Sequence, residues 1–432
     1  MQLKNRGTLA TLCLGVLTAC TAVANAQSWL PLPYQNDFVN HGRFSFTTGV
    51  LDTGGSRALL KRGNGVCINR LESDDTWTLE ADIAAPEPDI DFGFQGCIDE
   101  DIAIVTAPGW VDDDGVERGR AYAYERDPKS GEWNLTYTFE PYDIDPDSAG
   151  LGGFTFGYRV SLDDGLAVIT DKRALEDRGY ARFFERTAPG TWVERNTFFG
   201  LADEDRFGAS VDIQSGLVDL CAVGASQLEM PDANGTIEFF IRDESGNWVP
   251  QPDLLEGPGE LGWPTDIDIA GGRMAVSASN QYGLPGIVEI WEGSEDEWNR
   301  RTTILGGGEE KGFFGSTVQL WTSKLLVTQV FTLGLPSDGA ALLYESNDEG
   351  EWRITHAFNG ALNFPSNSGC SARMIGDHVL VRTNDMVRDH IRDEYQYPPD
   401  PPRPGCTGDL NGDGIVDAGD LGLLIAAWGV CP

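Results

Sequence analysis

Short segments of apolar or alternating apolar and polar residues follow one another along most of this chain, separated by turns rich in Asp, Gly and Ser. Residues 119–124, Gly-Arg-Ala-Tyr-Ala-Tyr, and residues 165–169, Gly-Leu-Ala-Val-Ile, are representative. Alternation with a period of two is typical of strands with one buried face, and the intervening turn residues favour hairpins. The pattern therefore predicts an all-β chain of short antiparallel strands.

A tryptophan recurs seven times at similar intervals, and consecutive members lie 48 to 59 residues apart. The seven are Trp29, Trp77, Trp133, Trp192, Trp248, Trp298 and Trp352. Each interval contains an aromatic-Gly step with an alternating strand, an apolar strand, an aromatic strand after Gly, and a final strand opened by the tryptophan. Four strands repeated at about this period indicate a β-propeller, here with seven blades over residues 27–396. We expect the tryptophans to pack between blades rather than to form a sugar-binding surface.

The two ends of the repeat predict how the ring closes. Residues 27–32 match an outermost strand but follow no inner strands, whereas residues 371–375, 378–382 and 390–395 supply inner strands with no tryptophan strand after them. An N-terminal strand that completes the last blade would leave no unpaired sheet edge. We therefore predict that residues 27–32 close the ring.

The aromatic-Gly steps resemble FG-GAP repeats, the propeller repeats of integrin α-subunit heads, over residues 90–360. The resemblance rests on four steps: Phe92-Gly93, Phe156-Gly157, Phe207-Gly208 and Phe314-Gly315. It implies an adhesive propeller, in some blades with calcium loops of the Asp-x-Asp-x-Asp-Gly type. Residues 112–115, Asp-Asp-Asp-Gly, lack this alternate spacing, so we expect a solvated loop there.

Residues 1–26 have the order of an export signal. Lys4 and Arg6 precede an apolar run, and the small residues Ala24 and Ala26 come just before a cleavage site that makes Gln27 the mature N-terminus. A lipoprotein anchored at Cys20 is the alternative, because residues 17–20 resemble a lipobox. No later stretch approaches the roughly 20 apolar residues of a transmembrane helix. We expect a secreted or cell-surface protein.

Charge and cysteine content restrict the partners and the redox state. The formal net charge of −37 argues against nucleic acid, which requires a basic surface. Export permits disulfides, and we predict a bridge between Cys406 and Cys431. The sequence leaves Cys67, Cys97, Cys221 and Cys370 open between up to two bridges, such as Cys67 with Cys97, and buried thiols.

The C-terminal residues carry the most specific chemical motif. A Pro-rich linker, residues 397–405, leads to a module at residues 406–432. There a twelve-residue loop offers oxygen ligands at the positions that Ca²⁺ uses in such loops, with Gly414 at the sharp turn and a short apolar helix expected after it. The predicted ligands are Asp409, Asn411, Asp413, the carbonyl of Ile415, Asp417 and Asp420.

This loop resembles a single dockerin type I repeat. The resemblance implies a cohesin-like or surface-sorting partner for the module. A typical dockerin has two loops and this chain has one, and Ala418 and Gly419 stand where partner-contacting side chains are frequent. Pro-rich linker, paired cysteines and loop together also resemble C-terminal tags of planctomycete-type exported proteins.

The sequence contains no catalytic motif of the metalloprotease, nucleophile-elbow, P-loop or CxxC type. Four carboxylates, Asp99, Asp163, Asp212 and Asp268, fall near predicted inner strands and are candidates for an acid/base pair, although we favour surface or turn roles for them. We expect a non-catalytic propeller that binds or displays, with an extracellular protein or polysaccharide as ligand. A polysaccharide-active enzyme and a structural cell-surface component are the alternatives.

Overall fold

The computed structural model describes most of the predicted propeller. The described residues are 38–44, 49–88, 90–142, 156–226, 234–258, 262–279, 286–294, 297–306, 312–331, 340–347, 350–359, 372–382 and 387–392. The export signal, Trp29, the linker and the whole module at residues 406–432 lie outside them, so the predictions made there are not addressed by the structure.

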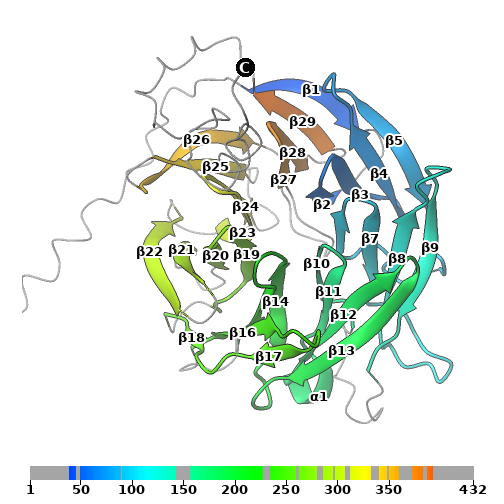
Figure 1. Cartoon of the computed structure of the whole chain (residues 1–432). Helices are drawn as coiled ribbons and strands as arrows, with labels where there is room; N and C mark the ends of the chain where they lie inside the picture. Colours follow the sequence, from blue (N-terminus) through cyan, green and yellow to red (C-terminus); the bar gives the residue numbers. More distant parts are fainter. Residues whose placement is uncertain are drawn as a thin grey trace, which may run out of the picture.

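Seven antiparallel sheets are arranged around a central axis (Figure 1). Blade 1 consists of β2 (Gly49–Gly54), β3 (Arg57–Arg62), β4 (Gly65–Leu71) and β5 (Trp77–Ile83). Blade 2 consists of β6 (Gly96–Asp99), β7 (Ile102–Ala107), β8 (Arg120–Arg126) and β9 (Trp133–Phe139). Blade 3 consists of β10 (Arg159–Asp163), β11 (Leu166–Asp171), β12 (Tyr180–Ala188) and β13 (Thr191–Phe199). The short helix α1 (Ala174–Asp177) connects β11 to β12.

Blades 4 to 6 repeat the same strand order. Blade 4 consists of β14 (Phe207–Gln214), β15 (Leu220–Ala225), β16 (Thr236–Arg242) and β17 (Trp248–Pro250) with β18 (Leu255–Glu256). Blade 5 consists of β19 (Asp266–Ala270), β20 (Arg273–Ala278), β21 (Ile287–Ser294) and β22 (Glu297–Leu305). Blade 6 consists of β23 (Gly312–Leu320), β24 (Lys324–Phe331), β25 (Ala340–Ser346) and β26 (Trp352–Asn359). In blades 1 to 6 the lowest-numbered strand lies nearest the axis (Figure 1). The predicted seven-bladed β-propeller is confirmed.

The last blade joins the two ends of the described chain. It contains β27 (Ala372–Ile375), β28 (His378–Arg382), β29 (Val387–Arg392) and, on the outside, β1 (Phe38–Phe44), which pairs antiparallel with β29. Closure by an N-terminal strand is therefore confirmed. The prediction that residues 27–32 form that strand is wrong, because the outermost position is already taken by Phe38–Phe44. This strand has no tryptophan, so the tryptophan period did not locate it.

The core is divided into seven apolar clusters, each between two adjacent blades. Each tryptophan that begins an outermost strand packs into the cluster shared with the preceding blade. These tryptophans are Trp77, Trp133, Trp192, Trp248, Trp298 and Trp352. Their expected packing role is confirmed, since burial of such large side chains against a neighbouring sheet is what holds blades together.

The aromatic-Gly steps serve the same blade contacts. Phe156 and Phe207 are fully buried, and the glycines after them have φ of +96° and +89°. A Cβ atom on Gly157 would come within 2.9 Å of the Thr106 Cβ in the preceding blade, and these backbone angles disfavour any other residue. The recurrence of this dipeptide is thus required by close blade packing.

Three cysteines within the described residues, Cys67, Cys97 and Cys221, are buried thiols without disulfides. A Cys67–Cys97 bridge is excluded by their orientation, although they occupy neighbouring blades. Cys67 packs in the cluster between blades 7 and 1, whereas Cys97 packs in the cluster between blades 2 and 3. Cys370, Cys406 and Cys431 lie outside the described residues.

Candidate functional site

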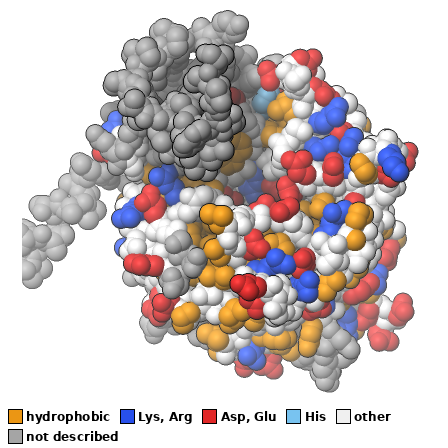
Figure 2. Space-filling view, viewed as in Figure 1, with side chains coloured by type: hydrophobic (Ala, Val, Ile, Leu, Met, Phe, Trp, Pro, Cys, Tyr) orange, Lys and Arg blue, Asp and Glu red, His pale blue; other side chains and the backbone are white. Residues whose placement is uncertain are grey.

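The innermost strands enclose a cavity of about 630 Å³ on the propeller axis. Residues of β2, β6, β10, β14, β19, β23 and blade 7 line it. Acidic and basic side chains both gather near the centre of the face seen in Figure 2. We call this cavity the channel; its size is typical of small-ligand sites.

The four carboxylates selected from the sequence all line the channel. Each accepts a hydrogen bond from a backbone N–H of the next blade. The donors are Asp164 to Asp99 at 2.9 Å, Ser215 to Asp163 at 2.6 Å, Ile269 to Asp212 at 2.7 Å and Leu320 to Asp268 at 2.6 Å. For Asp212 and Asp268 the favoured surface or turn role is wrong, because these side chains connect innermost strands across the blade junctions. Asp99 and Asp163 end their strands and bond to residues just after the innermost strand of the next blade, which is consistent with a turn role.

Similar bonds occur at the remaining junctions around the channel. Asp52 accepts from the Ile98 N–H and Asp266 from the Val318 N–H, both at 3.0 Å. Gln319 accepts from the Met374 N–H at 2.6 Å, and the Thr53 hydroxyl donates to the Met374 carbonyl at 2.6 Å. Since one edge of an innermost strand has no strand beside it, its N–H groups need other acceptors. We call these connections the channel ring.

Asp212 has both carboxylate oxygens engaged, one with Ile269 and the other with the Ser161 hydroxyl at 2.8 Å. Burial raises its pKa to about 7, and the neighbouring Asp266 adds to this. Burial also raises the pKa of Asp268 well above its usual range, with the Asp212 charge next in importance. These two acids, from adjacent blades, interact, and the structure thus brings this pair of sequence candidates together.

Arginines balance part of the acidic lining. Arg159, Arg373 and Arg382 line the channel, and Arg373 Nε lies 3.5 Å from Asp52 Oδ1. Burial raises the pKa of Asp266, while the charges of Arg159 and Arg373 oppose that increase. The channel can therefore offer hydrogen-bond acceptors, donors and positive charge to one ligand.

Blade 3 contributes an aromatic and basic group at the beginning of β10. The Tyr158 ring has Lys172 Nζ 3.9 Å and Arg159 Cζ 4.6 Å from its centroid. Burial would raise the pKa of Tyr158, but the charges of Arg159 and Lys172 lower it to about 8. Tyr158 and Arg159 both line the channel. We call Tyr158, Arg159, Lys172 and Arg173 the blade 3 cluster.

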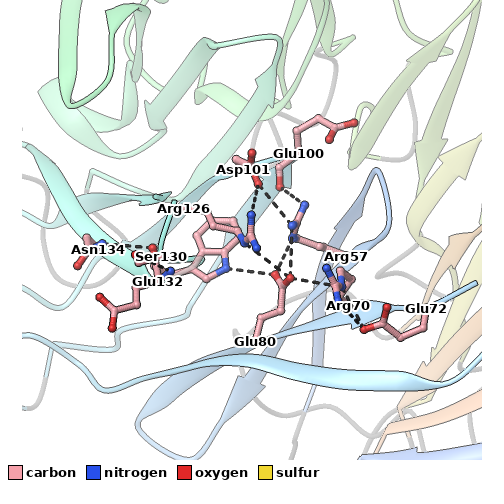
Figure 3. Close-up of polar contacts among 11 residues, drawn as sticks. Arg57, Arg70, Glu72, Glu80, Glu100, Asp101, Arg126, Ser130, Glu132 and Asn134 are labelled. Carbon is pink, nitrogen blue, oxygen red and sulfur yellow. Dashed lines mark hydrogen bonds and ion pairs between the residues drawn. The ribbon is translucent and has the colours of Figure 1, made fainter. Parts of the chain in front are cut away.

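A second hollow, of about 740 Å³, lies at the hairpin turns of blades 2 and 3. Its arginines are engaged in ion pairs: Arg186 lies 2.7 Å from Glu125, and Arg126 lies 3.7 Å from Glu80. Figure 3 shows Arg126, Arg57 and Arg70 converging on the Glu80 carboxylate at the junction of blades 1 and 2. This arrangement has the character of a structural ion network.

Candidate metal sites are not found in the part of the chain that the structure describes, where no three His, Cys, Asp or Glu side chains form a group able to hold an ion. In the turn at residues 112–115, Asp112 accepts hydrogen bonds from the N–H groups of Asp114 and Val116. The predicted Ca²⁺ ligands Asp409, Asn411, Asp413, Ile415, Asp417 and Asp420 lie outside the described residues. The calcium site remains a prediction.

The sequence reasoning missed Asp52, Asp266 and Gln319 of the channel ring, and the blade 3 cluster. An available signal was the presence of an Asp in the first strand of each of the first five blades. The blade 3 cluster gave no comparable signal, because Tyr158-Arg159 and Lys172-Arg173 are separated in sequence and meet only across the β10–β11 pair.

Among the described residues, no helix has the length and apolar character of a membrane span. No family model matches the chain, and no curated protein sequence matches it.

Solved structures show the same fold. A "putative 6-phosphogluconolactonase" from Bacteroides uniformis aligns with a TM-score of 0.54 and 13% identity, covering 82% of this chain and 94% of its own. The periplasmic gluconolactonase PpgL of Pseudomonas aeruginosa aligns with a TM-score of 0.50 and 16% identity, covering 82% and 93%. At these identities the likeness establishes the propeller fold alone, which many different functions share.

Proposed function

We propose that this chain is an exported, non-catalytic propeller that binds an extracellular ligand in its channel and is tethered or sorted through the calcium-binding module at residues 406–432. One observation carries the first part: the channel carboxylates are held by backbone N–H groups of the next blade. Asp212, with both oxygens bonded, would have to leave two partners before it could transfer a proton to a substrate. A fixed polar lining of this kind suits recognition.

A second candidate is an enzyme that acts on a small polar substrate or a polysaccharide end in the channel. The interacting acids Asp212 and Asp268 favour it, because raised carboxyl pKa values are frequent among catalytic acids. Two propellers of similar fold also have lactonase names. The hydrogen bonds of the channel ring explain the same acids without catalysis, so we place this candidate second.

The test combines binding with product analysis on the purified chain. Soluble polysaccharides, both neutral and acidic, and their oligosaccharides are screened by calorimetry, and each mixture is analysed for products by chromatography. We expect binding without product. Gln95→Trp, which places a large ring in the channel lining, is expected to abolish binding. The matched control Val249→Trp adds the same ring on the exposed outermost strand β17 and should bind normally.

The Asp212→Asn variant separates the two candidates. Asparagine keeps an acceptor for the Ile269 N–H, so a binding propeller should retain affinity within about threefold. Product formation by the wild type that is lost in Asp212→Asn would overturn the proposal in favour of the enzyme. Unchanged binding in Gln95→Trp would contradict a channel site.

A further inference from the structure

Trp321 is a tryptophan outside the repeating series, and it lines the channel. It follows directly after β23, in the turn to β24, where its N–H donates to the Lys324 carbonyl at 2.7 Å. It packs against the apolar cluster between blades 6 and 7, yet it remains partly exposed. Trp321 is therefore an aromatic side chain held at the channel, whereas the repeat tryptophans begin outermost strands.

The turn that contains Trp321 departs from the repeat. The residue directly after the innermost strand is Gly, Glu, Asp or Ser in the other blades, namely Gly55, Glu100, Asp164, Ser215, Gly271 and Gly376. Four residues separate Leu320 from its partner Leu325, whereas two separate Ala270 from Arg273 in blade 5. In repeat folds, insertions in single repeats often belong to the binding face. The position and length of this turn therefore point to a binding role.

The innermost strands share one direction, so their last residues lie at one end of the channel. In β19 and β23, for example, Asp266 bonds to the Val318 N–H, and further along both strands Asp268 bonds to the Leu320 N–H. We call this end the strand-end mouth. The last residues of β6, β10, β14, β19 and β23, all of which line the channel, are Asp99, Asp163, Gln214, Ala270 and Leu320. Trp321 directly follows Leu320 and therefore lies at this mouth.

The arginines that line the channel lie at its opposite end. Arg159 is the first residue of β10, and Arg373 is the second residue of β27. Arg382 ends β28, which runs antiparallel to β27 and pairs Val381 with Ala372 at the beginning of that strand. Among the described residues that line the channel, the strand-end mouth thus has carboxylates and no Lys or Arg. Like charges repel, so this mouth disfavours an anionic ligand.

Hydrogen-bonding groups accompany Trp321 at this mouth. Asp268 uses one carboxylate oxygen to accept from the N–H of Leu320, the residue before Trp321, and keeps the other oxygen. Gln214 contributes an amide at the end of β14. The intervening turn of blade 5 is Gly271-Gly272, where a Cβ atom on Gly271 would meet nothing within 4 Å. An aromatic surface with acceptors and an amide nearby suits a sugar ring, which has apolar C–H faces and a rim of hydroxyls.

We propose that the channel binds a neutral sugar through the strand-end mouth, with a C–H face of the sugar ring on Trp321 and its hydroxyls toward Asp268 and Gln214. This inference rests on the proposed binding function and names its ligand class. A rigid aromatic side chain provides a large contact area at a small loss of conformational entropy. The same chemistry occurs in a free monosaccharide and in the end of a neutral polysaccharide. The cavity of about 630 Å³ accommodates either.

Calorimetry on the purified full chain measures the binding of glucose, galactose and mannose, of their β-1,4-linked trisaccharides, and of the uronate of each hexose. We expect at least one neutral sugar to bind, and its uronate to bind at least about tenfold more weakly, because a carboxylate would face the carboxylates of the mouth. Tighter binding of the trisaccharide would indicate a polysaccharide end, and equal binding a free sugar. A uronate that binds as tightly as its neutral sugar, or no binding of any neutral sugar, would overturn the proposal.

Matched tryptophan variants locate the site. Trp321→Leu keeps an apolar side chain against the cluster between blades 6 and 7 but removes the stacking surface, so it should weaken binding about tenfold or more. Trp321→Tyr keeps an aromatic ring and should bind within about threefold of the wild type. The control Trp352→Leu makes the same change at a partly exposed tryptophan of the outermost strand β26 and should bind normally. Unchanged binding in Trp321→Leu, with folding verified by circular dichroism, would contradict the assignment.

Tryptophan fluorescence gives an independent check. A sugar ring on Trp321 displaces water from the indole, so saturating sugar should change the emission of the wild type and leave that of Trp321→Tyr unchanged. An equal change in both proteins would argue against stacking on Trp321. An acidic ligand whose binding is lost in Gln95→Trp and retained in Trp321→Leu would refute this ligand class and leave the proposed function intact. A neutral sugar that binds through Trp321 and is converted to product would do the reverse.

Discussion

The carboxylates of the channel ring and those of the outer junctions have opposite electrostatic surroundings. In the ring, Asp212 and Asp268 receive hydrogen bonds from backbone N–H groups, and burial raises the pKa of each. At the junction of blades 1 and 2, burial would raise the pKa of Glu80, but its hydrogen bond with Arg57 and the Arg57 charge lower it (Figure 3).

The donors explain the difference. A guanidinium group supplies a full charge and two or more N–H donors, as in the 2.7 Å contact of Arg57 Nε with Glu80. A backbone N–H supplies only a partial charge, which does not offset the loss of hydration in a buried place. Both arrangements connect adjacent blades, but only in the outer one does a full positive charge balance the charge of the carboxylate. The channel ring therefore retains buried acids whose protonation can change with pH or when a ligand binds.

The largest effect is expected from Glu80→Ala. It removes the closest partner of the buried Arg57, which keeps Asp101 at 3.4 Å and the Glu100 carbonyl at 3.0 Å, and it removes the acceptor of the Trp133 indole N–H, at 3.3 Å. Breaking a buried ion pair from one side costs about 3–5 kcal/mol. Chemical denaturation should show this loss in the free energy of unfolding. Glu351→Ala, at an exposed pair with Arg353, should change stability by less than about 1 kcal/mol, and equal effects of the two variants would refute the outer network.

A smaller effect with a distinct pH dependence is expected from Asp212→Asn. The folded-state pKa of about 7 lies above the unfolded value of 3.8, so its contribution to stability is present below about pH 4 and is lost as the pH rises to 7. The variant should therefore gain stability relative to the wild type at pH 8, by up to about 4 kcal/mol, and not at pH 4. Melting temperatures across this range measure it. Asp113→Asn, in an exposed turn, serves as the matched control.

The junction of blades 7 and 1, which closes the ring, has a buried carboxylate like the channel ring and a side chain that can carry positive charge like the outer junctions. Asp389 on β29 accepts from the Trp77 indole at 2.9 Å and lies 3.0 Å from His378 Nδ1. Burial would lower the pKa of His378, but Asp389 and then Asp75 raise it above 6.5. The stabilisation is thus complete below about pH 6.5 and is lost as the pH rises through the higher folded-state pKa.

His378→Gln should remove this pH dependence, with an expected change of about 1 kcal/mol between pH 6 and 9 in the wild type. Thermal unfolding of both proteins at these pH values tests it, and His356→Gln, where the ring stacks on Phe358, serves as the matched histidine control. A wild type whose stability rises over the same interval would contradict the closing ion pair.

The smallest effect is expected from Ca²⁺ on the propeller itself. The described residues hold no group suited to a metal, so calcium should not change the melting temperature of the Asp409→Ala, Asp413→Ala double variant. The wild type should bind about one Ca²⁺ through the C-terminal loop. Several ions bound by the double variant would show calcium sites outside the C-terminal loop and would contradict this expectation.

Much of the architecture was predictable because it repeats. The tryptophan period identified six of the outermost strands, and the aromatic-Gly steps identified positions where only glycine fits between blades. The closing strand escaped prediction because β1 lacks a tryptophan and is recognised only by its pairing with β29. The candidate acids were correctly placed near the axis, but the role of Asp212 and Asp268 was not predicted, since their partners are backbone groups about 50 residues away.

The sequence by itself determined the all-β class, the seven blades, the order of strands and the acidic surface, because each follows from local alternation, turn chemistry and a regular period. Only the tertiary structure decided which strand closes the ring, that Cys67 and Cys97 face different blade junctions, and that Tyr158, Arg159 and Lys172 form one cluster. These features depend on contacts between residues distant in sequence. Such contacts are set by the twist and packing of whole sheets, which no local pattern encodes.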